Sequence, residues 1–165
     1  MDILSHGLYG GAAFGRKSKP KYWLAFFFGI APDLFSFGIF SASVWFGFAH
    51  GLEWRMGPPD PSLIPQYVHQ LYNITHSFIT FTLAFFLVWA LLKRPAWEML
   101  AWGLHVAMDI FTHSDKFFPT PFLWPISDYT FNGVSWSQPA IFFPNVALLA
   151  LVYGYWWYSR RMRSA

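Results

Sequence analysis

"ITHSFITFTLAFFLVWALL", residues 74–92, decides the fold class of this chain. The stretch contains no Asp, Glu, Lys or Arg, and it is followed directly by Lys93 and Arg94. As a helix with a rise of ~1.5 Å per residue it would extend ~28 Å, close to the ~30 Å thickness of a bilayer's hydrocarbon core. The stretch therefore predicts a transmembrane helix.

The composition supports the same environment for the whole chain. Of the 165 residues, 55% are hydrophobic and only 12% are charged, which is too few charges for the surface of an ordinary soluble domain. The length fits one domain, so residues 1–165 are predicted to form a single membrane-embedded unit. There is no cysteine, which leaves His, Asp and Glu as the side chains that could bind a metal.

Other apolar segments complete the predicted architecture. Residues 2–15 form a short segment rich in Gly and Ala, and residues 114–138 and 49–71 are expected to be connecting loops. Pro32 is expected to break or kink the segment 22–48. The prediction is an all-α, polytopic membrane helical bundle with about four transmembrane helices, over 22–48, 74–92, 96–113 and 140–158, plus a short N-terminal helix.

The basic residues predict the orientation. Nine of the eleven Lys and Arg residues fall in three clusters, at 16–21, 93–94 and 160–163, which lie on one side of a consistent zigzag. The positive-inside rule makes that side cytoplasmic in a cell (inner) membrane, with the C-terminus on the same side. Short clusters beside membrane segments do not resemble a nucleic-acid surface, so no nucleic-acid partner is expected.

Ionisable residues within the apolar segments are the candidate functional residues. In "LHVAMDIFTHSDK", residues 104–116, His105, Asp109 and His113 recur at steps of four and share one face of a helix. Asp33, His76 and His6 lie in or beside other apolar segments. Charged groups in a membrane are costly and are functional candidates by default, although a hydrogen-bonded structural ladder would also satisfy them.

Metal binding explains this residue set better than isolated packing roles do. His and Asp suit zinc and similar divalent ions, and His105 with Asp109 offers two ligands one helical turn apart. We expect one or two divalent ions, with zinc as the expected metal. The candidate ligands are His6, Asp33, His76, His105, Asp109 and His113.

The order of these motifs resembles a known family. An early His6, "PD" at residues 32–33, "THS" at residues 75–77 and HxxxD at residues 105–109 are similar to the YdjM-like family of bacterial inner-membrane metal-dependent hydrolases. The resemblance covers nearly the whole chain and implies a helical membrane protein whose His and Asp residues bind metal, with a distant similarity in ligand pattern to zinc-dependent phospholipase C. Phe35 stands where many members have a second Asp, and His113 and Asp115 could supply replacement ligands.

The expected activity is hydrolysis of a phosphoester in a membrane lipid or lipid-linked substrate by a metal-activated water. Asp33 or Asp109 could act as the base, and the sequence does not choose between them. A non-enzymatic protein that binds or transports a divalent metal is the alternative. Thr75, Ser77 and Thr112 could orient the ligands or could instead bond to their own helices.

The position of the site in the membrane is also predicted. Counting ~1.5 Å per residue from the basic clusters places all the candidate ligands at or beyond the midplane of a ~30 Å core. The site should therefore face the extracytoplasmic side, where the loop 114–138 could cover it. An ion path would instead require polar residues through the full thickness.

Overall fold

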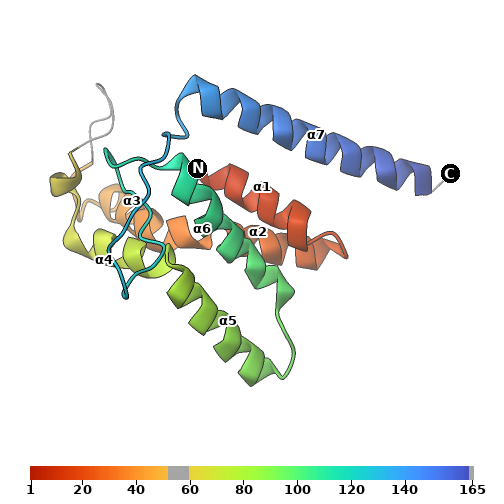
Figure 1. The fold of residues 1–165 in the computed structure, drawn as a ribbon, viewed down its shortest axis with the longest axis horizontal. Helices are drawn as coiled ribbons and strands as arrows, with labels where there is room; N and C mark the ends of the chain where they lie inside the picture. The colour runs from red at the N-terminus through yellow and green to blue at the C-terminus, as the bar shows by residue number, and fades with distance from the viewer. Residues whose placement is uncertain (52–59, 164–165) are drawn as a thin grey trace.

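The computed structural model describes residues 1–51 and 60–163, and within these ranges the chain forms helices without β-strands apart from an isolated bridge at Ser114 and Phe117. Figure 1 shows the arrangement. The all-α prediction is confirmed for the described residues. The elements are α1 (Ile3–Phe14), α2 (Lys19–Asp33), the π-helical η1 (Leu34–Gly38), α3 (Ile39–Trp45), the 3₁₀ turn η2 (Pro61–Leu63), α4 (Gln66–Thr75), α5 (Phe78–Leu92), the 3₁₀ turn η3 (Trp97–Met99), α6 (Leu100–Thr112) and α7 (Pro139–Arg163).

Helices α1, α2 and α6 pack together and form the interior of the molecule. Asp2 begins α1 as its N-cap, because its carboxylate accepts a hydrogen bond from the backbone N–H of Ser5 at 2.9 Å. Gly29 lets α2 approach α1 closely: a Cβ atom at this position would lie 2.5 Å from the backbone oxygen of His6. Small residues at such crossings are typical of membrane helices, since they allow the backbones themselves to come into contact.

Helix α2 continues through η1 into α3 without a break and gives a helical segment of 27 residues, Lys19–Trp45. Pro32 lies inside it, and the π-helical turn follows directly. The Ser36 hydroxyl donates to the Pro32 carbonyl at 2.9 Å, so this carbonyl has a partner within the distorted turn. Pro32 is therefore followed by a change in the helical pattern, and the helix does not end there.

The segment predicted as one helix over 74–92 is two helices. Helices α4 and α5 meet at an angle of 61°, and the break falls at His76 and Ser77. Ser77 is the N-cap of α5 and accepts a hydrogen bond from the Ile79 N–H at 3.0 Å. Most of α4 lies in the region 49–71 that was predicted to be a loop, so that prediction is wrong for residues 66–71; residues 52–59 lie outside the described part of the chain.

The prediction of about four transmembrane helices is too high. Two described segments are long and apolar enough to cross a membrane, Lys19–Trp45 and Pro139–Met162, and the bent pair of α4 and α5 makes a third if it counts as one span. Helix α6 has 13 residues and a length of ~20 Å, too short for a ~30 Å core. The segment 96–113 is shorter as an α-helix than predicted because Trp97–Met99 forms a 3₁₀ turn at its start.

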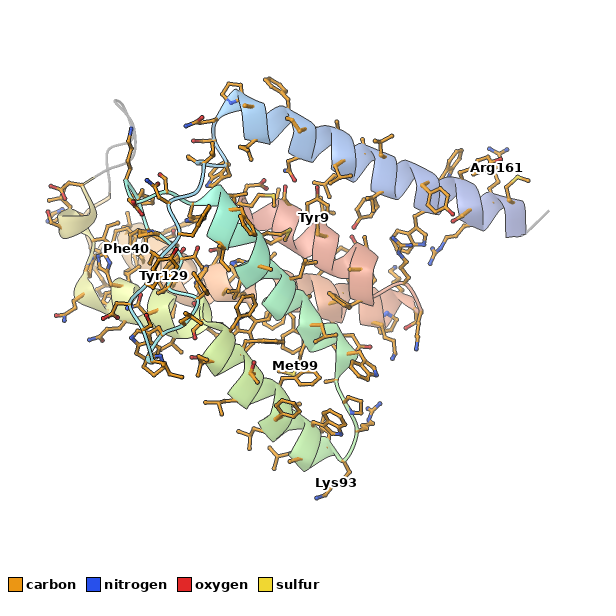
Figure 2. All side chains as sticks on the ribbon, viewed as in Figure 1. Tyr9, Phe40, Lys93, Met99, Tyr129 and Arg161 are labelled. Carbon is orange, nitrogen blue, oxygen red and sulfur yellow. The ribbon has the colours of Figure 1, made fainter. Side chains whose placement is uncertain are left out.

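An apolar cluster closes the end of the molecule opposite the α5–α6 connection. Its buried members come from α3, α4, residue 64 and the loop 114–138, and we call it the aromatic cap. In Figure 2, Phe40 in the cap lies at the left of the molecule, and Lys93 after α5 lies at the bottom, well away from it. The cap consists of Phe40, Ile64, Val68, Tyr72 and Phe118.

Candidate metal centre

Four of the predicted ligands meet at one point between the helices. Asp33 ends α2, His76 lies at the break between α4 and α5, and His105 and Asp109 are one turn apart on α6. One donor atom from each lies within 4.8 Å of the others. The side chains of His76, His105 and Asp109 are fully buried, whereas that of Asp33 is 16% exposed.

The distances between these donor atoms are similar to those between the ligands of a single bound metal ion. His105 Nε2 lies 3.1 Å from Asp109 Oδ2, and His76 Nε2 lies 3.4 Å from Asp33 Oδ1. The other histidine–carboxylate distances are 3.6 Å, from His76 to Asp109, and 3.9 Å, from His105 to Asp33. Ligands of a tetrahedral zinc ion at its usual bond lengths are ~3.3 Å apart, so the four atoms need only small shifts to hold such an ion.

Backbone carbonyls set the orientation of both histidine rings. His105 Nδ1 lies 2.7 Å from the Gly29 carbonyl oxygen, and His76 Nδ1 lies 3.1 Å from the Tyr72 carbonyl oxygen. A carbonyl oxygen only accepts hydrogen bonds, so each Nδ1 carries the proton of the neutral ring. Each Nε2 then directs an unprotonated lone pair toward the centre, which is the arrangement of metal-binding histidines.

The two Nε2 atoms face each other at 3.0 Å. With both Nδ1 protons donated elsewhere, neutral rings have no proton to place between these two nitrogens. Two lone pairs in contact inside a buried site are unfavourable unless a positive charge lies between them. A divalent cation bound jointly with Asp33 and Asp109 would supply that charge, so the residues fit a metal ion.

Asp109 also has a second set of partners on its other oxygen. His6 Nε2 lies 2.9 Å from Asp109 Oδ1, and His113 Nε2 lies 3.5 Å from the same oxygen. The amino group of Met1 contacts this oxygen too. The two ring nitrogens of His6 are buried and lack a hydrogen-bond partner of correct geometry. Asp109 thus joins the four-residue cluster to His6 and His113.

His113 is held in the same way as the other histidines, although it lies just beyond the end of α6. Its Nδ1 donates a hydrogen bond to the Phe118 carbonyl at 2.9 Å. The other ring nitrogen, Nε2, then points toward Asp109. Burial lowers the pKa of His113, and the nearby Asp109 carboxylate only partly offsets this effect. The neutral ring, the form that binds metals, is therefore favoured.

Thr75 and Thr112 each bond to a carbonyl of their own helix and also lie close to a candidate ligand, so both roles suggested by the sequence are present. Thr75 bonds back to the Leu71 carbonyl at 2.8 Å and also lies 3.0 Å from His76 Nδ1. Thr112 bonds back to the Met108 carbonyl at 3.0 Å and lies 3.4 Å from Asp109 Oδ1. Ser77 instead caps α5.

Asp115, the other suggested replacement ligand, lies exposed on the loop that follows α6. Its backbone N–H donates to the Asn132 side chain at 3.2 Å.

Sequence reasoning did not identify Tyr72 as part of this site. Its ring stacks on that of His76 with centroids 3.7 Å apart, and its hydroxyl donates to the Phe118 carbonyl at 2.9 Å. Tyr72 therefore connects the centre to the aromatic cap. The spacing of four residues between Tyr72 and His76 was an available signal, whereas the carbonyls of Gly29 and Phe118 have no side-chain signature.

Comparison with known proteins identifies a family for this chain. No curated protein and no solved structure matches the chain. The model of the family described as YdjM inner membrane protein matches residues 1–165, which is the full length. With its apolar helices and its buried His and Asp cluster, the chain belongs to the YdjM inner membrane protein family.

Proposed function

We propose that this protein is a membrane-embedded metal-dependent hydrolase that cleaves a phosphoester of a lipid or lipid-linked substrate. The observation that carries the proposal is the pair of Nε2 lone pairs of His76 and His105, 3.0 Å apart and flanked by two carboxylates. A divalent ion, with zinc the best match to these ligands, would act there as a Lewis acid and lower the pKa of water.

The two carboxylates are suited to different roles. Asp109 is fully buried and has a histidine on each of its oxygens, so it holds the ligands together. Asp33 is the partly exposed carboxylate, next to the exposed side chains of Leu34 and Phe35. A substrate headgroup that approaches along α2 and η1 would reach Asp33 first. We therefore assign Asp33 as the base: His76, His105 and Asp109 as three ligands would leave one position at the ion for water, and Asp33 would accept the proton of that water.

The same residues bear on the number of ions. Asp109 Oδ2 belongs to the four-residue cluster, and Asp109 Oδ1 faces His6 and His113. A carboxylate with ligands on both sides could bridge two ions, as in two-metal phosphoesterases. One ion in the four-residue cluster is the minimum that the proposal requires.

The site is proposed to face the extracytoplasmic side of the inner membrane. In Figure 1 the chain between α1 and α2, the α5–α6 connection and the C-terminal end of α7 all lie away from the end that carries α3 and α4. Together with the first turn of α2, these three places hold nine of the basic residues, which favours a cytoplasmic location for that side. Asp33 lies at the end of α2 that is far from Lys19 and Lys21, and His76 lies just before α5, at the end of that helix far from Lys93 and Arg94.

A metal-binding or metal-transporting protein without enzymatic activity is the second candidate. An ion path needs polar side chains through the whole membrane thickness. The six candidate ligands instead form one connected group around Asp109, which favours a catalytic centre.

Metal analysis combined with a hydrolysis screen tests the proposal. The purified protein in lipid nanodiscs should contain at least one divalent ion per chain and release phosphate-containing products from a phospholipid panel. His105→Gln and Asp109→Asn should each lower metal affinity at least tenfold, because each removes a ligand of the ion. His50→Gln removes an exposed imidazole and serves as the matched control, with metal content and activity unchanged.

Full metal occupancy in both ligand variants would contradict the metal centre. Bound metal without hydrolysis of any lipid phosphoester would instead favour the metal-binding alternative.

A further inference from the structure

The C-terminal ends of α1 and α7 converge on a small pocket that is separate from the metal centre. Its volume is about 240 Å³, and its lining residues come from the turn after α1 and the last turns of α7. The metal centre uses the opposite end of α1, where His6 lies. The pocket is lined by Arg16, Tyr155, Trp156, Ser159 and Arg160.

Two guanidinium groups share one indole ring in this pocket. The Arg160 Cζ atom lies 4.6 Å from the centroid of the Trp156 ring, and the Arg16 Cζ atom lies 5.9 Å from it. The Tyr22 ring also packs against Trp156, with centroids 5.7 Å apart. Tyr22 and Tyr153 fix α7 in this register through a hydroxyl–hydroxyl hydrogen bond of 2.8 Å. The fold therefore brings together two arginines that are far apart in the sequence.

The charge of the pocket selects an anion. None of its five lining residues is acidic, and two of them are arginines, so the lining carries a net positive charge. Guanidinium groups present planar, forked donors that match the oxygens of a phosphate group in a bidentate manner. An anion with several oxygens in this pocket would be attracted by the positive charges of both Arg16 and Arg160.

The location identifies the source of the phosphate. Trp156 and Arg160 lie near the end of the candidate span Pro139–Met162, where a membrane helix enters the headgroup region. Arg161, labelled in Figure 2, marks the same end of α7, and its guanidinium lies 5.5 Å from the Trp157 ring centroid. We propose that this pocket binds the headgroup phosphate of an anionic phospholipid, in the leaflet next to the C-terminal end of α7.

Native mass spectrometry of protein transferred from mixed micelles tests this site. With equal amounts of phosphatidylglycerol and phosphatidylcholine, the wild-type protein should retain the anionic lipid preferentially. The double variant Arg16→Lys with Arg160→Lys keeps the charge but loses the forked donors, and its retention of phosphatidylglycerol should fall about tenfold. Lys17→Gln removes a neighbouring exposed charge and should retain the lipid like the wild type.

Three outcomes would overturn the proposal: unchanged retention in the double variant, an equal loss in Lys17→Gln, or an equivalent effect of inorganic phosphate added without anionic lipid. Circular dichroism checks that the double variant keeps its helical content, and Arg160→Lys alone replaces it if it does not. The metal content of all these variants should be that of the wild type, so this test is independent of the proposed hydrolase activity.

Discussion

Helices α6 and α7 differ in a way that explains how this molecule is built. Helix α6 has only 13 residues, yet it places His105, Val106 and Asp109 in the fully buried interior. Helix α7 has 25 residues and is the longest uninterrupted α-helix in the described part of the chain, but only 6% of its most apolar 18-residue stretch is buried inside the protein. Length and hydropathy therefore identify the helix that faces lipid, and ionisable residues identify the helix that forms the interior.

The physical reason is the solvent. Lipid chains are as apolar as a leucine side chain, so a hydrophobic helix gains little by moving from lipid into the protein. Polar and ionisable side chains gain a great deal, because only the protein interior offers them hydrogen bonds and charges. The buried positions of this chain accordingly include His6, His76, His105 and Asp109.

The same glycine substitution in the two regions should have opposite effects, and this is the largest difference we expect. Gly29→Ala places a Cβ atom 2.5 Å from the His6 backbone oxygen, so α1 and α2 must separate. This should lower the free energy of unfolding by about 1–3 kcal/mol, and it should weaken metal binding because the Gly29 carbonyl orients His105.

Gly154→Ala is the control in α7, where a Cβ atom would meet nothing within 4 Å. It should leave metal binding unchanged and stabilise the helix by up to ~1 kcal/mol. Thermal unfolding in nanodiscs and metal analysis measure both variants. If both variants changed the free energy of unfolding and the metal content equally, the proposed difference between the buried helices and the lipid-facing helix α7 would be wrong.

Truncation of apolar side chains sharpens the comparison at a smaller scale. Val106 on α6 is 0% exposed, and Leu151 on α7 is 70% exposed. Val106→Ala should lower the free energy of unfolding by about 1–2 kcal/mol through lost packing, whereas Leu151→Ala should change it by less than about 0.5 kcal/mol. A destabilisation by Leu151→Ala as large as that by Val106→Ala would show that α7 is covered by protein, for example in an oligomer.

Cysteine labelling perturbs the protein least and tests which ends of the helices lie on which side. Because the chain has no cysteine, each introduced thiol reports alone. Ser62→Cys and Asp128→Cys, both at exposed positions, should react with an impermeant thiol reagent added outside intact cells or spheroplasts. Lys17→Cys should react only after the membrane is opened. The reverse pattern would place the metal centre on the cytoplasmic side.

Several features could be predicted from the sequence because they depend on local chemistry. The low charge and the apolar runs indicate a membrane protein, and the step of four from His105 to Asp109 places two ligands on one helical face. The short N-terminal helix at residues 2–15 and the absence of regular strands are likewise confirmed for the described residues. These predictions required only helix geometry and the energetics of charge in lipid.

The number of spans, the helical state of residues 66–71 and the break at His76 were decided by the tertiary structure. At that break the Ser77 hydroxyl caps α5 and also donates to the Trp124 carbonyl in a distant loop. The division of the histidines between the two oxygens of Asp109, and the Gly29 carbonyl that orients His105, also depend on contacts between distant segments. Hydropathy and local spacing contain no information on such contacts, because they arise only when the backbones of separate helices meet.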